Sequence, residues 1–184
     1  SRNNSPLLIG GFFCKKTPII AQYLKSMKLL YLLLTCYMLS FTVHAQLGEN
    51  TQAPNFDLMS YDGLRVQLET SQSKVTIVNF WASWCGPCIK SLDHTIIPLY
   101  NKYDRTKVNV IGISNDIKEE KWRAAIERYK IPWVNVWDED RKLVRAYQVP
   151  AIPTYFLVNQ KGIIIASNVY ANQLKSAVKK ALKN

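Results

Sequence analysis

From residue 50 onward, short apolar runs alternate with stretches in which apolar residues recur at helical spacing. Continuous or alternating apolar runs of five to eight residues are typical of strands, whereas apolar residues at i, i+3, i+4 and i+7 indicate an amphipathic helix. Strands are predicted at residues 74–81, 107–114, 133–137, 154–159 and 162–167. Helices are predicted at residues 85–103, 116–129, 141–147 and 171–183, the first with a kink at Pro98. This alternation predicts an α/β fold with an antiparallel hairpin at its C-terminal end.

Two local patterns refine this order. Residues 50–68 contain Pro54, an Asp62-Gly63 turn signal and alternating apolar residues, which predict an N-terminal β-hairpin. Asp116 and Glu119 have the spacing of a capping box. The helix that would follow carries its apolar side chains on one face, at Trp122, Ala125, Ile126 and Tyr129.

The segment from Met27 to Ala45 has the organisation of a signal peptide. Lys28 precedes a run of 15 mostly apolar residues, and small residues stand at positions 43 and 45, so cleavage is expected before Gln46. The main alternative is a retained membrane anchor, although a spanning helix needs roughly 20 apolar residues. A lipoprotein modified at Cys36 is less favoured, because Thr35 precedes that cysteine.

Three parts of the chain follow from this interpretation. Residues 1–26 lie upstream of a plausible start and are not expected in the mature protein, residues 27–45 form the signal peptide, and residues 46–184 form the folded domain. The formal net charge is +11, of which residues 1–45 carry +5 and the domain +6. No recognition motif accompanies this moderate charge, so nucleic-acid binding is not favoured.

The predicted cleavage point determines which cysteines remain in the folded domain. Cys14 and Cys36 precede the predicted cleavage point, so the domain keeps only Cys85 and Cys88. A structural zinc site needs four ligands, and the domain adds only His94 to the two thiols. A static disulfide around two residues would stabilise little, because that contribution grows with loop length. The pair is therefore predicted to be a dithiol that opens and closes, with no cofactor.

The predicted helix start makes the two thiols unequal. Cys85 would lie at the helix N-terminus, where free N–H groups and the helix dipole stabilise a thiolate. Cys88 would lie one turn further in, shielded and placed to attack a mixed disulfide. Pro87 suits a first helical turn, since its missing N–H has no partner to lose there. Gly86 leaves the surface beside the sulfur open to a protein substrate.

The motif FWASWCGPC, followed far downstream by AIPT, resembles the thioredoxin superfamily. The N-terminal APNFDL, the asparagine in VNFWASWC and the GIS run make the TlpA/ResA-like exported thiol–disulfide oxidoreductases the most similar group, over about residues 48–183. This resemblance implies a thioredoxin-like fold with an N-terminal β-hairpin extension and a central βα insertion at about residues 115–137. It also implies a cis peptide bond before Pro153, with Ile152 offering backbone groups to an incoming peptide.

The chain departs from that family pattern beside the cysteines. Asn79 stands where thioredoxin has a buried aspartate, as in the exported relatives, but Ser91 and Asp93 replace a glutamate and a proline that those relatives commonly carry. The usual acid–base carboxylate is therefore missing. Asp93 is expected to face solvent, His94 to be a surface or half-buried helix residue rather than a proton shuttle, and Trp84 to lie at the rim of the site.

Together these features predict an exported enzyme, periplasmic or otherwise in the cell envelope, that exchanges disulfides with protein partners. Cys85 would attack and Cys88 would resolve, supported by Trp84, Gly86, Pro87, Ile152 and Pro153. The Gly-Pro dipeptide resembles that of reducing members, so a reductant supplied by an extracytoplasmic thiol donor is favoured. A disulfide oxidant or isomerase, and a redox-inert peptide-binding module, remain the alternatives.

Export gives the first testable prediction. The native protein should begin at Gln46, because signal peptidase reads the small residues Val43 and Ala45. N-terminal sequencing of protein isolated from its own cells measures this directly. Mature material that begins at Ser1 or Met27 would contradict the cleaved signal.

Overall fold

The computed structural model describes residues 23–24, 27–28, 30–32 and 47–183. The chain divides into two units, residues 1–45 and 46–184. The described residues of the first unit are helical and exposed. Among the described residues, no helix has both the length and the apolar character needed to cross a bilayer. Most of the predicted signal peptide, and its cleavage point, lie outside these residues.

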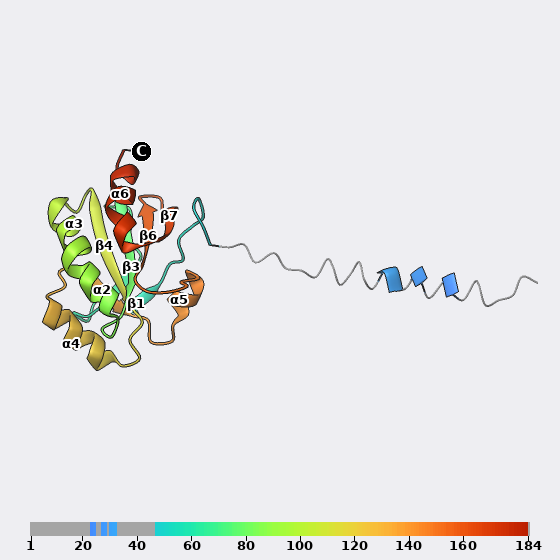
Figure 1. Ribbon diagram of the computed structural model, residues 1–184, viewed down its shortest axis with the longest axis horizontal. Helices are drawn as coiled ribbons and strands as arrows, with labels where there is room; N and C mark the ends of the chain where they lie inside the picture. Colours follow the sequence, from blue (N-terminus) through green and yellow to red (C-terminus); the bar gives the residue numbers. More distant parts are fainter. Residues whose placement is uncertain (1–22, 25–26, 29, 33–46, 184) are drawn as a thin grey trace, which may run out of the picture. The chain divides into compact units, whose positions relative to one another are not determined.

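A five-stranded mixed sheet forms the centre of the second unit, in the order β5-β4-β3-β6-β7 (Figure 1). Its strands are β3 (Val75–Trp81), β4 (Val108–Ser114), β5 (Val134–Trp137), β6 (Thr154–Asn159) and β7 (Ile164–Val169). Strands β3, β4 and β5 run parallel, whereas β6 is antiparallel to both β3 and β7. Every residue of β3 is buried, as its continuous apolar run predicts. The predicted α/β fold with a C-terminal antiparallel hairpin is therefore confirmed.

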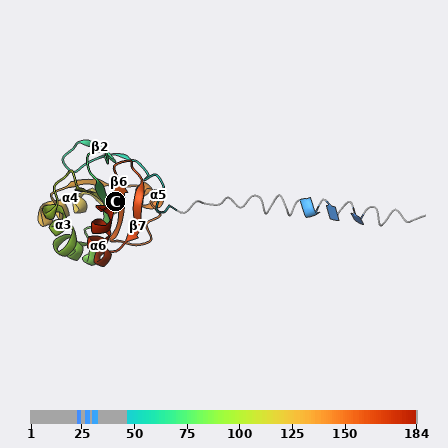
Figure 2. The same cartoon turned by 90° about the horizontal axis from the view of Figure 1, so that it is seen from above.

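The helices cover the two faces of this sheet (Figures 1 and 2). They are α2 (Gly86–Ser91), the π-helical segment η1 (Leu92–Ile96), α3 (Ile97–Lys102), α4 (Glu119–Tyr129), α5 (Lys142–Ala146) and α6 (Ala171–Ala181). Buried residues of α2, η1, α3, α4 and α6 share one core cluster with the cysteines. Helix α5 packs in a second cluster, together with Ala53 and Phe56 from the N-terminal segment.

The predicted N-terminal hairpin forms a separate two-stranded sheet. Its strands β1 (Asp57–Met59) and β2 (Arg65–Gln67) pair antiparallel across a turn in which Gly63 has φ +81°. A single bridge from Ser60 to Val136 connects this hairpin with the edge strand β5. The predicted βα insertion supplies α4 and β5 and so extends the sheet by one parallel strand.

The long helix predicted at residues 85–103 forms, and its middle contains a wider, π-helical turn. In η1 the N–H of Ile97 bonds to the carbonyl of Leu92, five residues earlier. Pro98, which has no N–H to donate, then stands in the first turn of α3. The chain therefore absorbs the proline with one wider turn and continues as a helix.

The predicted capping box at Asp116 is wrong. Helix α4 begins at Glu119, and its N-cap residue Lys118 makes no side-chain cap. The carboxylate of Asp116 is instead bonded by Ser83 and Ser114. The predicted apolar face of α4 is correct, since Trp122, Ala125 and Ile126 are buried.

Gly112 gives a prediction for stability. A Cβ added there would lie 2.0 Å from Oδ1 of Asn135, the atom that accepts a hydrogen bond from Nε1 of buried Trp81. Gly112→Ala should therefore lower the free energy of unfolding by about 1–3 kcal/mol, the usual cost of overpacking. Urea denaturation measures this difference.

Gly86→Ala is the matched control, because a Cβ there would meet nothing within 4 Å. Its free energy of unfolding should stay within about 0.5 kcal/mol of the wild type. Equal losses in the two variants would show that the Asn135–Trp81 contact is not what Gly112 protects.

Candidate active site

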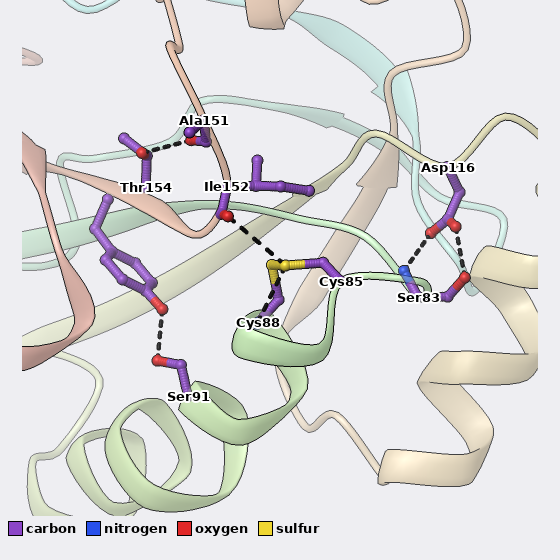
Figure 3. Close-up of a disulfide and its surroundings, with 9 residues drawn as sticks. Ser83, Cys85, Cys88, Ser91, Asp116, Ala151, Ile152 and Thr154 are labelled. Carbon is purple, nitrogen blue, oxygen red and sulfur yellow. Dashed lines mark hydrogen bonds between the residues drawn. A yellow bond between two sulfur atoms is a disulfide. The ribbon is translucent and has the colours of Figure 1, made fainter.

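The cysteine pair lies where β3 leaves the sheet and α2 begins (Figure 3). Residues 82–84 form the connecting turn, in which the N–H of Cys85 bonds to the carbonyl of Ala82. Cys85 is the N-cap of α2, and Pro87 occupies the first helical turn, as predicted. A buried strand therefore delivers the first cysteine directly to a helix N-terminus.

A disulfide joins Cys85 to Cys88. The backbone N–H of Cys88 also donates a hydrogen bond of 3.2 Å to Sγ of Cys85. This N–H is one of the free donors of a helix start, and it remains available to the same sulfur after reduction. Stabilisation of a thiolate by such a donor favours ionisation of Cys85.

The surroundings of the two sulfurs differ. In the disulfide form both cysteines are buried, with 5% of Cys85 and 1% of Cys88 exposed. The residues that border Cys85 in sequence are exposed, including Trp84 at 64%, Gly86 and Pro87. Both cysteines belong to the same core cluster, but Cys88 is the more buried of the two. An incoming molecule therefore meets the Cys85 side of the disulfide first.

The segment before β6 passes over the disulfide. The Ile152–Pro153 peptide bond is cis, as the family resemblance implies. The carbonyl oxygen of Ile152 lies 3.7 Å from Sγ of Cys85, and the hydroxyl of Thr154 donates to the carbonyl of Ala151 (Figure 3). Ile152 and Pro153 are only partly buried, so part of this segment is exposed beside Cys85.

Asp116 fixes the turn that leads into Cys85. Its carboxylate accepts hydrogen bonds from the backbone N–H and the hydroxyl of Ser83, at 2.9 and 2.6 Å, and a third from the Ser114 hydroxyl at 2.8 Å. The side chain is 2% exposed. The spacing of Asp116 and Glu119 predicts a helix cap instead. The contact between Asp116 and Ser83 spans 33 residues, so no local sequence pattern reveals it.

A second polar group lies on the core side of Cys88. The hydroxyls of Ser91 and Tyr155 are 2.6 Å apart, and both residues are buried. Burial raises the pKa of Tyr155 to about 12, although the hydrogen bond with Ser91 acts in the opposite direction. Tyr155 is therefore a neutral hydrogen-bonding group at any physiological pH. No local pattern in the sequence points to this hydroxyl.

The remaining predicted positions agree with the structure. Asp93 and His94 are exposed on η1, which leaves the core side of the cysteines without a carboxylate from this helix. Asn79 is buried in β3 below the site. Among the described residues, no group of three or more metal-binding side chains gathers.

A family model described as Redoxin matches residues 48–182. The chain belongs to the Redoxin family. It is 27% identical to a thiol-disulfide oxidoreductase ResA from Bacillus thuringiensis subsp. konkukian over 149 residues, which cover 81% of this chain and 85% of the relative. It is 28% identical to the protein of the same name from Bacillus subtilis over 131 residues, or 71% of this chain and 73% of that relative.

A solved structure supports the same assignment. The crystal structure of a putative thiol:disulfide interchange protein DsbE from Chlorobium tepidum superimposes with a TM-score of 0.66 at 26% identity, covering 73% of this chain and 97% of that one. Together these similarities place this Redoxin family member in the TlpA/ResA-like group of the thioredoxin superfamily. The protein is a thioredoxin-like thiol–disulfide oxidoreductase.

The position of Cys85 gives a prediction for the reduced enzyme. Its thiol should ionise with a pKa of about 6–7.5, below that of a free cysteine, because a helix N-terminus stabilises the thiolate. Cys88→Ser leaves Cys85 as the domain's one thiol, and its alkylation rate against pH reports this pKa. Cys85→Ser is the matched control and should alkylate far more slowly near neutral pH. Faster reaction at Cys88 would reverse the two assignments.

Proposed function

We propose that this enzyme acts outside the cytoplasm, reduces disulfides in partner proteins, attacks with Cys85 and resolves with Cys88. The observation that carries the proposal is the asymmetry of the pair. Cys85 caps α2 beside exposed residues and accepts the N–H of Cys88, whereas Cys88 lies one turn into the helix and is 1% exposed. One sulfur is thus placed for a partner and the other for an intramolecular attack.

The reaction would proceed in two exchanges. The Cys85 thiolate attacks one sulfur of the partner disulfide, forming a mixed disulfide and releasing the partner's other sulfur as a thiolate. The Cys88 thiolate then attacks Sγ of Cys85, which forms the Cys85–Cys88 disulfide and releases the partner's second thiolate. The dithiol loses two electrons and the partner gains them. An extracytoplasmic thiol donor must then return two electrons to the disulfide.

The partner would bind beside the cis-proline segment. Ile152 and Pro153 are partly exposed next to Cys85, and Trp84, the residue before Cys85, is exposed. Backbone groups of Ile152 would hold an extended stretch of the partner, while Trp84 would contribute apolar contact area. Gly86 adds no side chain that could block this approach.

The alternatives make different predictions. An inert peptide-binding module would not reduce insulin disulfides, whereas the proposed enzyme would do so with a dithiol donor and lose turnover in Cys85→Ser. A disulfide oxidant would also exchange disulfides, but its reduction potential would be higher. Location outside the cytoplasm rests on the predicted leader at residues 27–45.

The direction of electron flow gives the next prediction. The Cys85–Cys88 pair should have a reduction potential of about −270 to −200 mV, because a Gly-Pro dithiol at a helix start stabilises the reduced form only moderately. Equilibration with glutathione buffers of known ratio measures this value, with thioredoxin as the reference protein. A value near −120 mV, the range of a strong oxidant, would overturn the reductant assignment.

A further inference from the structure

Asn79 has an unusual environment for an amide. Its side chain is 1% exposed, and neither its oxygen nor its nitrogen has a hydrogen-bond partner among the described residues. Burial of an unpaired amide is costly, and buried polar groups are nearly always satisfied. The cost becomes understandable if a partner for this amide forms only in another state of the enzyme.

Asn79 and Tyr155 occupy the same face of the sheet. They are direct partners in the antiparallel pairing of β3 with β6, so their side chains project to the same side. Alternate residues of β3, Ile77 and Trp81, belong to the core cluster that contains both cysteines and Tyr155. On the other side of Asn79 the paired residue is Gly112, which has no side chain to bond to the amide.

Tyr155 extends this polar layer to α2. Its hydroxyl meets that of Ser91, which lies three residues after Cys88 in the helical run (Figure 3). Residues three apart share a helix face, and helical side chains tilt toward the N-terminus. Ser91 therefore leans toward Cys88. In the disulfide form, however, no hydrogen bond joins Ser91 to that sulfur among the described contacts.

The pair of hydroxyls at Ser91 and Tyr155 contains one hydrogen that their mutual hydrogen bond does not use. Two hydroxyls carry two hydrogens, but the Ser91–Tyr155 contact uses only one of them. The other hydroxyl hydrogen has no acceptor among the described residues, and the Asn79 amide adds two more unused hydrogens. Three hydrogens are thus free to be donated on the core side of Cys88.

Charged groups are absent from this side of the described site. The strands below contribute only neutral Tyr155 as a titratable group, and residues 151–153 contribute none. On the helix that carries Cys88, the charged or titratable residues Lys90, Asp93 and His94 are exposed. The buried carboxylate of Asp116 is bonded to Ser83, two residues before Cys85. A base for the Cys88 proton is therefore missing, whereas donors for its thiolate are present.

We propose that Ser91, Tyr155 and Asn79 form a neutral set of hydrogen-bond donors that stabilises the Cys88 thiolate during resolution of the mixed disulfide. This inference rests on the proposed roles of Cys85 and Cys88. Opening of the disulfide frees Sγ of Cys88 to turn toward the donors. Ser91 donates to it directly, Tyr155 holds the Ser91 hydroxyl in position, and Asn79 supplies the amide hydrogens.

The step balances without a protein base. The Cys88 proton passes to water, and the donors lower the cost of the negative charge that remains. The thiolate then attacks Sγ of Cys85, the bond between Cys85 and the partner breaks, and the partner leaves as a thiolate that takes a proton from water. The donor set replaces the missing carboxylate by stabilising the product of ionisation rather than by accepting the proton.

Reaction of the reduced enzyme with 5,5′-dithiobis(2-nitrobenzoate) separates the two exchanges. Attack by Cys85 releases the first coloured thiolate and leaves a mixed disulfide, and attack by Cys88 releases the second. Stopped-flow measurement of the second phase against pH reports ionisation of Cys88. In Ser91→Ala its pH midpoint should rise by about one unit, the effect of one hydrogen bond to a charged group.

The rates of the two phases, and the behaviour of further variants, show whether the shift reflects stabilisation of the Cys88 thiolate. Near neutral pH the second phase of Ser91→Ala should slow only about threefold, because a more basic thiolate is a better nucleophile, and above the midpoint its rate should match or exceed the wild type. The first phase should not change. Tyr155→Phe and Asn79→Leu should shift the midpoint in the same direction, and Ser91→Thr, which keeps the hydroxyl, should retain the wild-type midpoint.

Matched controls exclude general effects of a lost hydroxyl. Tyr147 belongs to the second core cluster, and Tyr147→Phe removes a hydroxyl that bonds to the carbonyl of Pro54. Ser73→Ala removes the hydroxyl of a buried serine, which bonds to the carbonyl of Arg105. Neither should move the midpoint. The inference is overturned if Ser91→Ala and Tyr155→Phe leave the midpoint in place, or if the controls move it equally. Release of a single coloured thiolate by the wild type would instead contradict the proposed roles of the two cysteines.

Discussion

The antiparallel pairing of β3 with β6 is the constraint on which the site depends. Because the two strands run in opposite directions, the end of β3 lies beside the start of β6. Cys85 follows β3 and Pro153 precedes β6, so the pairing brings together residues that are 68 positions apart. Complete burial of β3 fixes this register, since a slip by one residue would turn its core-facing side chains to the opposite face.

Rigid support around the first cysteine complements this register. Asp116, at the end of the neighbouring parallel strand, bonds to both the backbone and the hydroxyl of Ser83, two residues before Cys85. Trp137 in turn donates to the carbonyl of Asp116 at 2.7 Å. The turn is therefore tied to β4 and β5, so the edge strand supplied by the βα insertion also supports the active site. Nucleophile and rim are held by the sheet rather than by a free loop.

The polar layer beneath Cys88 shows how the fold accommodates a neutral site. An ionised carboxylate would be expensive to bury there, whereas hydroxyl and amide groups carry a smaller desolvation cost. The structure accepts that smaller cost at Asn79, whose amide is unpaired in the disulfide form. A group that is poorly satisfied in one redox state and satisfied in the other stabilises the second state relative to the first. Such a layer therefore favours the reduced pair and shifts its reduction potential upward, away from the most strongly reducing values.

Sequence alone determined the elements and the reactive pair, because both depend on local patterns. Strands such as β3 follow from apolar runs, and the N-cap position of Cys85 follows from Gly86, Pro87 and the strand before them. The cis bond before Pro153 was implied by family resemblance rather than by any local signal. The spacing of Asp116 and Glu119 predicts a helix cap, because a carboxylate three residues before a glutamate has that local spacing whatever it finally contacts.

Only tertiary structure decided which polar groups meet. Tyr155 lies 64 residues from Ser91 and within an apolar run, where a tyrosine resembles any other core aromatic residue. Its hydroxyl becomes significant because β6 pairs with β3 beneath the helix that carries Cys88. The unpaired amide of Asn79 is equally invisible in sequence, since hydrogen-bond satisfaction depends on every neighbour at once. Local chemistry therefore named the thiols, and strand pairing chose the groups that surround them.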